Sequence, residues 1–207
     1  MARYFEVHPD NPQPRSIAQV VQILQDGGVI AYPTDSGYAL GCKLGNNEGL
    51  ERIRRIRQLG DKHHFALVCK DFAQLGHYVQ MDNHVFRTVK QYTPGHYTFI
   101  LPATREVPKA MAHPKKKTVG VRIPQHTTAL ALLEELGEPL LSTSLILPGE
   151  EHQMTEGWRI NEELGTQLDA VLDDGEELED STTVIDWTEG EPEVLRVGSG
   201  DPAPFEA

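Results

Sequence analysis

The chain of 207 residues contains 39% hydrophobic and 24% charged residues, which is the composition of a globular protein and excludes a disordered or fibrous chain. No apolar run reaches the length of a bilayer crossing, and the first residues are not a secretory signal, so we expect a cytoplasmic protein without a membrane partner. In that compartment Cys42 and Cys69 are expected to be buried thiols.

The net charge of −12 is distributed unevenly along the chain. Residues 1–148 hold 17 Lys and Arg against 13 Asp and Glu, whereas residues 149–195 hold one basic residue against 16 acidic ones. The acidic third is expected to be a solubilising surface, and an RNA mimic is the alternative. Because the acidity is confined to this third, it does not exclude a basic, phosphate-binding surface elsewhere.

Helical and strand patterns alternate along the chain. Apolar residues recur at helical spacing in four segments, the first of them with Ser16 as its expected N-cap, and short apolar runs bounded by turn residues indicate strands. The alternation predicts an α/β fold with helices packed on a twisted sheet. The expected helices cover 16–25, 47–57, 82–92 and 127–136, and the expected strands cover 29–32, 65–69, 97–101, 119–124, 139–147, 169–172 and 182–187.

Several common catalytic and cofactor motifs are missing from the sequence. It has no phosphate-binding P-loop, no Rossmann glycine fingerprint and no His-Glu-x-x-His zinc motif. The adjacent His63 and His64 would point to opposite faces of a strand, which argues against a shared metal ion. No metal site is therefore predicted.

One segment combines small hydroxyls, a proline and glycines directly after an expected buried strand. Residues 32–41 read Tyr-Pro-Thr-Asp-Ser-Gly-Tyr-Ala-Leu-Gly. Such a segment at a strand end can present backbone N–H groups and hydroxyls to a ligand, and it can equally be an ordinary capped turn. From this segment alone both interpretations stay open.

Five segments in a fixed order carry a resemblance. They read GGVIAYPTDSGYALGC from Gly27, TPGHYTFIL from Thr93, TVGVRIP from Thr118, LSTS from Leu141 and STTVID from Ser181. Together they resemble the YrdC-like family of threonylcarbamoyl-AMP synthases, and within it the YciO branch. The resemblance divides the chain into an N-terminal extension (1–14), a YrdC-like domain (15–198) and a C-terminal tail (199–207).

The resemblance implies a single α/β domain whose twisted mixed sheet and helices surround a concave, basic cavity. Members of the family bind ATP, L-threonine and bicarbonate there and release threonylcarbamoyl-AMP and pyrophosphate. The product serves the t6A modification of tRNA, and relatives also bind double-stranded RNA or tRNA. We therefore expect ATP or AMP, L-threonine and bicarbonate as ligands, Mg²⁺ brought with ATP, and no tightly bound cofactor.

The resemblance also implies a set of ligand-binding residues, without assigning a catalytic one. It places two residues in the threonine pocket, two basic residues at the Lys-x-Arg motif and just after it, four residues on the nucleotide side and one arginine in the final strand. In that order they are Thr34 and Tyr38; Arg57 and Lys62; Thr98, Arg122, Ser142 and Ser144; and Arg196.

Two positions depart from the family pattern. The arginine of Lys-x-Arg falls on Leu59, and the asparagine of Ser-x-Asn falls on Ile146. Each replacement removes a hydrogen-bond donor, a loss of the order of 10²–10³ in rate for a group that stabilises a transition state. The sequence therefore predicts a diverged relative in which synthase activity is weakened.

Three functional interpretations remain at this point. The first is an enzyme, either a synthase or an adenylate hydrolase. The second is a non-catalytic module that holds double-stranded RNA or tRNA through the cavity and the arginines of residues 52–57, with Lys115, Lys116 and Lys117 as a flanking clamp or merely a solvated loop. The third is a protein partner in a modification complex, which would use the acidic third as its surface.

Overall fold

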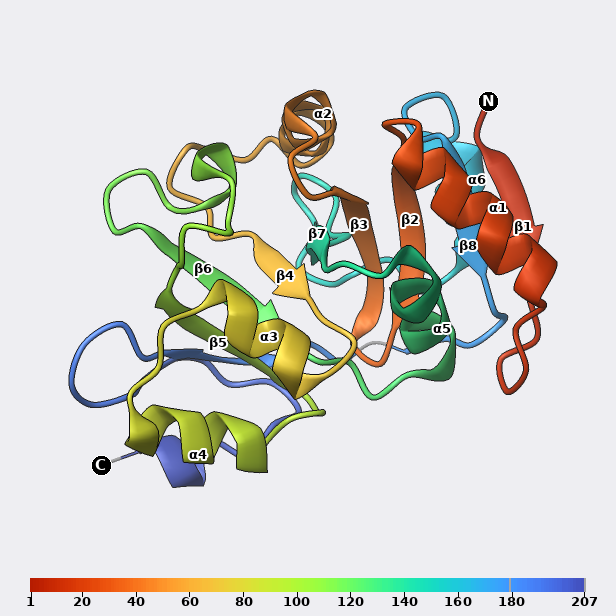
Figure 1. Ribbon diagram of the computed structural model, residues 1–207. Coiled ribbons are helices and arrows are strands. Elements are labelled where there is room, and N and C mark those ends of the chain that lie inside the picture. The colour runs from red at the N-terminus through yellow and green to blue at the C-terminus, as the bar shows by residue number, and fades with distance from the viewer. Residues whose placement is uncertain (179, 207) are drawn as a thin grey trace.

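Ten strands form one twisted mixed sheet in the computed structural model, which describes residues 1–178 and 180–206 (Figure 1). The order of the strands across the sheet is β1-β8-β2-β3-β7-β4-β6-β5-β9-β10. The strands are β1 (Arg3–Glu6), β2 (Val29–Thr34), β3 (Gly37–Lys43), β4 (Ala66–Val68), β5 (Tyr97–Pro102), β6 (Thr118–Arg122), β7 (Leu140–Ser144), β8 (Ala170–Asp173), β9 (Thr183–Asp186) and β10 (Glu193–Arg196).

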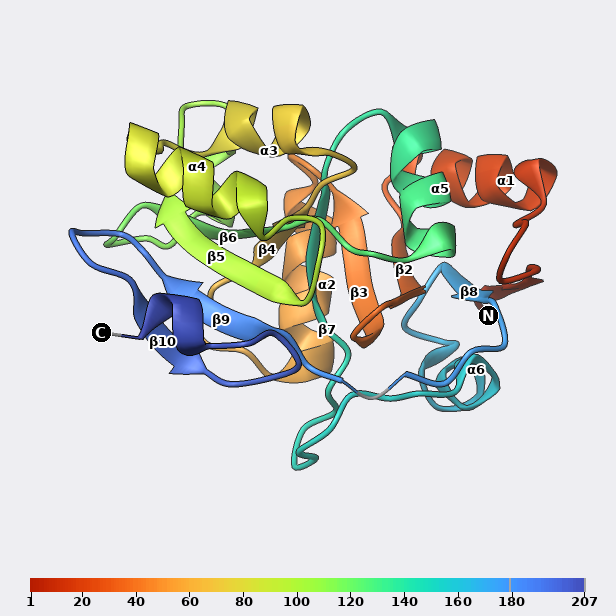
Figure 2. The same cartoon turned by 90° about the horizontal axis from the view of Figure 1, so that it is seen from below.

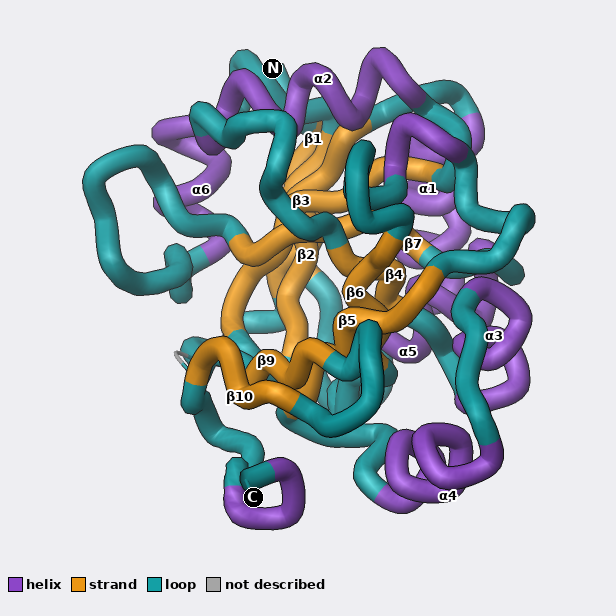
Figure 3. Tube along the Cα trace, turned by 90° about the vertical axis from the view of Figure 1, so that its left-hand side faces the viewer, coloured by secondary structure: helices purple, strands orange, loops and turns teal. Residues whose placement is uncertain are grey.

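Helices cover both faces of this sheet, as expected for an α/β fold. Figure 2 shows α1 and α5 side by side, and Figure 3 shows helices surrounding the strands. The helices are α1 (Pro14–Gln25), α2 (Asn47–Arg57), α3 (Phe72–Tyr78), α4 (Asn83–Gln91), α5 (Thr127–Leu136) and α6 (Gly157–Leu164), with short 3₁₀ turns at Lys109–Met111 and Ala203–Phe205.

Two apolar clusters lie on opposite faces of the sheet because successive side chains of a strand alternate. In β2, Val29 and Ala31 belong to the larger cluster, which includes Leu50 and Ile53 of α2. The intervening Ile30 and Tyr32 belong to the smaller cluster, which α1 and α5 complete. The smaller cluster spans only part of its face, and this leaves room for a site beside it.

Several element boundaries differ from the sequence predictions. The N-cap prediction for Ser16 is wrong: α1 begins at Pro14, whose fixed φ suits a first helical position, and Ser16 lies inside the helix. The elements α3, α6, β1 and β3 were not predicted, whereas β10 contains Arg196, which the resemblance placed in the final strand. In β3, Gly41 allows close packing, because a Cβ there would lie 2.7 Å from Leu140 Cδ2 and 3.0 Å from Tyr32 Cε1.

Both ends of the chain take part in the fold. The segment expected as an N-terminal extension contributes β1, which pairs in parallel with β8. The segment expected as a C-terminal tail places Phe205 in the larger apolar cluster. Cys42 and Cys69 are buried thiols, as predicted. Across the described residues we find no helix with the length and apolar character to cross a bilayer.

Candidate functional site

A small hollow lies on the face of the sheet that α1 and α5 leave partly uncovered. Its volume is about 50 Å³, enough for roughly three to five water molecules at 10–15 Å³ each. Most of the residues that line it are serines, threonines and tyrosines of the strands and the β2–β3 turn, so hydroxyls dominate its surface. The lining residues are Tyr32, Thr34, Ser36, Tyr38, Ala39, Ala66, Val68, Thr98, Arg122, Ser142, Thr143, Ser144 and Thr182.

Strand alternation explains why polar residues gather on this face. Arg122 of β6 stands between Val121 and Ile123, which both point into the larger apolar cluster. In β7, Ser142 follows Leu141, and Ser144 precedes Leu145 just beyond the strand; both leucines belong to the same cluster. The sequence therefore alternates core residues with hydroxyls or a guanidinium, and the polar set converges where the strands adjoin.

Arg122 is the one basic residue in this lining, and it is almost completely buried, with a side-chain exposure of 6%. Its guanidinium forms an ion pair with Asp35 and donates through Nη1 to Ser36 Oγ at 2.6 Å. Asp35 also accepts the backbone N–H of Gln125 at 2.9 Å. Among the described residues Arg122 Nε has no hydrogen-bond partner, so the protein leaves this buried donor unsatisfied.

The expected threonine-pocket residues both line the hollow. Thr34 Oγ1 donates to Gly37 O at 2.7 Å and accepts the Ser36 N–H at 3.0 Å, as in an ordinary capped turn. The Tyr38 hydroxyl donates to Asp173 Oδ1 at 3.0 Å. Burial and the Asp173 charge raise the pKa of Tyr38 above its usual value, so the phenol stays protonated. The segment thus forms a tight turn and also faces the hollow.

The expected hydroxyls of the nucleotide side also reach the hollow. Ser142 Oγ lies 2.7 Å from the Tyr32 hydroxyl and donates to Leu40 O at 2.8 Å. The hydroxyls of Thr98 and Thr182 form a hydrogen bond with 2.9 Å between their Oγ1 atoms. Ser144 is half-buried on the same face. The structure therefore brings together Thr34, Tyr38, Thr98, Arg122, Ser142 and Ser144.

Two further arginines, Arg57 and Arg196, do not line the hollow, but each donates hydrogen bonds to a residue that does. Arg196 donates to Thr182 O through Nε and Nη2, at 3.1 and 2.9 Å. Arg57 donates to Thr143 Oγ1 at 2.8 Å and to Ile146 O at 3.0 Å. Burial, followed by the nearby charge of Arg196, lowers the pKa of Arg57. Both guanidinium groups are thus partly engaged by the fold itself.

His63 joins Arg57 and Thr143 in a hydrogen-bonded group, which we call the rim of the hollow. Its Nε2 lies 3.0 Å from Thr143 Oγ1, the atom that accepts from Arg57. Burial and then the charges of Arg57 and Arg54 lower the pKa of His63 to about 4. At neutral pH His63 is therefore an uncharged imidazole, while His64 turns to Thr118 Oγ1 at 2.9 Å. The two rings bind different hydroxyls, as expected for neighbours that point apart.

The remaining motif positions lie outside the hollow. Lys62 is exposed in the loop that precedes β4. Leu59 packs against the larger apolar cluster, and Ile146 contributes only its carbonyl, to Arg57. The structure does not show the concave basic cavity implied by the family resemblance: the lining of the hollow is dominated by hydroxyls, and its arginine is paired with Asp35.

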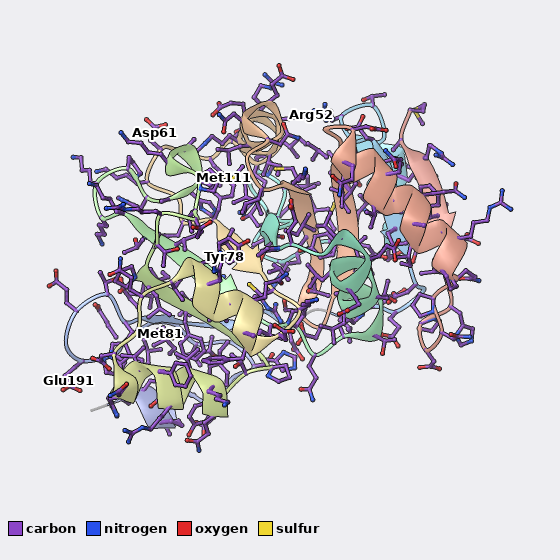
Figure 4. The ribbon with its side chains drawn as sticks, viewed as in Figure 1. Arg52, Asp61, Tyr78, Met81, Met111 and Glu191 are labelled. Carbon is purple, nitrogen blue, oxygen red and sulfur yellow. The ribbon has the colours of Figure 1, made fainter. Side chains whose placement is uncertain are left out.

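The arginines of α2 are largely used within the molecule. Arg52, labelled in Figure 4, pairs with Asp169. Arg54 donates to Gly60 O at 2.7 Å and lies over the Phe65 ring. Arg55 is the exposed member of the group. The helix therefore offers much less free positive charge than its sequence suggested.

A separate cluster of His126, Asp174 and Glu176 has donor atoms within 4.8 Å of one another, which would suit a metal ion by distance alone. However, His126 Nδ1 accepts the N–H of Ala129 at 3.2 Å as the N-cap of α5. A neutral imidazole with that acceptor carries its proton on Nε2, the atom that faces the carboxylates. The chemistry therefore fits an internal contact between histidine and carboxylate better than a metal centre.

Sequence reasoning missed several residues of the site. Asp35 and Ser36 lay within the 32–41 segment, but only their contacts with Arg122 reveal their role. Buried charge on a strand was the available signal, since Arg122 needed a counterion. His63, Thr143 and Thr182 had no sequence signal beyond their polarity, because their partners lie 14 to 86 residues away.

Replacing Asp35 should reveal the cost of an unpaired buried arginine. Asp35→Ala is expected to lower the free energy of unfolding by about 3–5 kcal/mol, because the Arg122 charge would remain buried without its counterion. Urea unfolding followed by circular dichroism measures this change. Asp35→Ala combined with Arg122→Met should recover part of the loss. A double variant less stable than Asp35→Ala would contradict the explanation.

The lowered pKa of His63 has a consequence for stability at acidic pH. The folded state resists protonation of this ring, whereas the unfolded chain protonates near the ordinary value of about 6.5. The contribution of His63 is therefore complete above pH 6.5 and is lost as pH falls toward 4. His63→Gln should lose less stability than the parent between pH 7 and 4.5 in urea titrations, and a ring titrating near 6.5 by NMR would contradict this.

Comparisons with known proteins found a matching family model, similar sequences and similar solved structures. The family model for Sua5, YciO and YrdC proteins, described as "Telomere recombination", matches residues 22–198. Escherichia coli YciO is 51% identical over 99% of this chain and 100% of its own, and its crystal structure matches with a TM-score of 0.96. A threonylcarbamoyl-AMP synthase from Vibrio vulnificus is 32% identical over 76% of this chain and 85% of its own.

A more distant likeness concerns a structure with a bound ligand. The crystal structure of P. abyssi Sua5 complexed with L-threonine is 25% identical in sequence and matches with a TM-score of 0.85. The match covers 94% of this chain but only 57% of that protein. Together, the matching family model and the high identity to YciO over the whole chain establish that this chain belongs to the Sua5/YciO/YrdC family.

Proposed function

We propose that this protein is an adenylate-handling enzyme of the threonylcarbamoyl type, which binds an L-threonine-derived group in the hollow. The observation that carries the proposal is the buried guanidinium of Arg122, fixed by Asp35 and Ser36 and left with a free Nε donor among the described residues. An immobilised cation with a spare N–H is suited to a carboxylate, carbamate or phosphate oxygen. The hydroxyls around it can bind the polar remainder of such a ligand.

The size of the hollow suggests which part of the ligand enters it. Pockets for drug-sized ligands span about 300–1,000 Å³, far above the 50 Å³ here. A carboxylate or carbamate end can enter with small adjustments of the walls, whereas a complete nucleotide cannot. The complex of P. abyssi Sua5 with L-threonine supports an amino acid as the small ligand.

The nucleotide would then lie against the rim, where Arg57, Arg196 and the exposed Lys62 can meet phosphate oxygens. Among the described lining residues the hollow contains no carboxylate, and both oxygens of nearby Asp35 are engaged by Arg122 and the Gln125 amide. The protein therefore offers no ligand set for Mg²⁺ there. In this proposal Mg²⁺ arrives with ATP, held by its phosphates and water.

The reaction that follows joins two anions, so it needs fixed positive charge. A carbamate oxygen, made from L-threonine and bicarbonate, attacks the α-phosphorus of ATP, and pyrophosphate leaves with the electron pair of the broken P–O bond. Leu59 and Ile146 supply no side-chain donor for this step. The proposal is consequently an enzyme with a weakened forward reaction, and hydrolysis of an adenylate by water is the alternative reaction.

Calorimetry with a conservative variant tests the proposal. L-Threonine, ATP and AMP should bind the parent protein, and Arg122→Lys should weaken L-threonine binding about 10- to 100-fold, because lysine keeps the charge opposite Asp35 but lacks the Nε donor. Arg55→Lys, on the exposed side of α2, is the matched control and should bind as the parent does. Absence of binding with and without Mg²⁺, or equal affinity in Arg122→Lys, would overturn the proposal.

A second candidate function is RNA binding, and one groove favours it. The groove has a volume of about 930 Å³ and contains Arg105, Lys109 and Lys117, with no acidic residue among the described residues that line it. It lies beside the exposed turn of Lys115 and Lys116. Met111, labelled in Figure 4, connects the segment before this turn to Gly45, because its Sδ accepts the Gly45 N–H at 3.3 Å. The surface that remains for RNA is therefore this groove rather than α2.

Salt dependence distinguishes the two functions. If RNA binds the groove, its affinity should fall steeply with salt, and replacing Lys115, Lys116 and Lys117 by Gln should reduce the slope of log K against log salt by about 0.7–0.9 for each phosphate that a lysine no longer neutralises. Fluorescence anisotropy with a labelled RNA duplex measures the slope. An unchanged slope in the triple variant, or no binding at low salt, would contradict this function.

A further inference from the structure

Strand β8 ends at Asp173, and Asp174 follows it directly. The two aspartates contact different neighbours of the hollow. Successive strand residues point in opposite directions, so the carboxylates of Asp173 and Asp174 reach different neighbours. Asp173 approaches Tyr38, and Asp174 approaches His126. Neither aspartate lines the hollow itself. Their importance for a ligand would therefore be indirect.

Asp173 accepts hydrogen bonds from Tyr38, which lines the hollow, and from two other donors. Its Oδ1 accepts the Tyr38 hydroxyl at 3.0 Å and the Gly175 N–H at 2.8 Å, while its Oδ2 accepts the hydroxyl of Tyr4 from β1. The start of α6 packs directly on this carboxylate, because a Cβ at Gly157 would lie 2.5 Å from Asp173 Cγ. The acceptor is thus held by three donors and by close packing.

The protonation states support this arrangement. Burial, together with the hydrogen bond to Asp173 and its charge, raises the pKa of both Tyr4 and Tyr38 above the ordinary value. Both phenols therefore remain donors throughout the neutral range. Tyr38, which is 2% exposed and packs in the larger apolar cluster, is consequently fixed at its hydroxyl end, and the residue also lines the hollow.

Asp174 is connected to Arg122 through His126, Gln125 and Asp35. Its side chain is fully buried, and its Oδ2 lies 3.1 Å from His126 Nε2, although without the alignment of a hydrogen bond. Burial alone would raise the pKa of Asp174, but His126 and the Glu176 amide hold it below its ordinary value. His126 is therefore retained at the N-terminus of α5 by a charged neighbour.

The next connection, between His126 and Gln125, is the peptide bond that joins them. His126 follows Gln125, whose N–H donates to Asp35 Oδ2 at 2.9 Å, and Asp35 pairs with Arg122. A displacement of His126 would move this amide and with it the counterion of the hollow's guanidinium. Asp173 and Asp174 thus act on two different walls from one strand end.

We infer that Asp173 and Asp174 are positioning residues of the site: Asp173 fixes the Tyr38 ring, and Asp174 fixes the Asp35–Arg122 pair through His126 and Gln125. This inference rests on the proposed function for its ligand. It extends that function, because it assigns a role to the acidic third of the chain and to Tyr4 of β1. Misplacement of a binding group by about 1 Å can cost up to 10²-fold, so supporting residues of this kind have measurable effects.

Double-variant cycles with L-threonine in calorimetry test the inference. Asp173→Ala and Tyr38→Phe should each weaken binding about tenfold, and the double variant should be no weaker than either one, since both remove the same hydrogen bond. Asp173→Asn retains an Oδ1 acceptor and should bind within about threefold of the parent. Additive losses would identify a general structural effect and overturn the inference.

The connection from Asp174 through His126 to the Asp35–Arg122 pair is tested in the same way. Asp174→Ala and His126→Ala should each weaken L-threonine binding about tenfold without adding to one another. Glu177→Gln, an exposed position on the same loop, is the matched control and should be unchanged. Folded single variants that bind within about twofold of the parent would overturn this part of the inference.

A ligand-free measurement separates this inference from the proposed function. In protein with ¹³C-labelled tyrosine, the ring resonances of Tyr38 should shift in Asp173→Ala and in Tyr4→Phe, and Tyr38→Phe assigns them. If the parent protein binds no L-threonine, the proposed function fails while these shifts still support the positioning role. Unchanged Tyr38 resonances in Asp173→Ala would overturn the positioning role whatever the ligand.

Discussion

The ion pair between Arg122 and Asp35 is the interaction on which the site depends. Burying a guanidinium is costly, and it is tolerated here because Asp35 and Ser36 approach from the β2–β3 turn. The pair joins the β2–β3 turn to β6, which is separated from β3 in the sheet by β7 and β4. It therefore determines how the hairpin turn sits relative to the rest of the polar face.

The fold class could be predicted from the sequence because apolar periodicity records burial directly. The strand at 29–32 and the helix at 47–57 coincide with β2 and α2 almost residue for residue. The strand β3 was missed because it is buried on both faces and contains two glycines, so neither alternation nor β-propensity identified it. The strand β1 was missed because it is short and depends on β8, which lies more than 160 residues away.

The site residues were predicted from the family resemblance rather than from physical pattern, and the structure shows why pattern was insufficient. Hydroxyls such as Thr98, Ser142 and Ser144 are ordinary in strands, and only the sheet order brings them together. The loss of side-chain donors at Leu59 and Ile146 has a structural counterpart. Arg57 donates through Nε to the Ile146 carbonyl and through Nη1 to Thr143, so part of its donor capacity is used within the fold.

The pairing of β1 with β8 also matters for synthesis of the chain. The two strands are parallel neighbours, although one contains residue 3 and the other residue 170. A ribosome adds about 5–20 residues per second, so β1 waits roughly 10–30 s before its partner exists. During this interval the strand that carries Tyr4 has no partner for its backbone hydrogen bonds, so this edge of the sheet can form only after synthesis has passed residue 173.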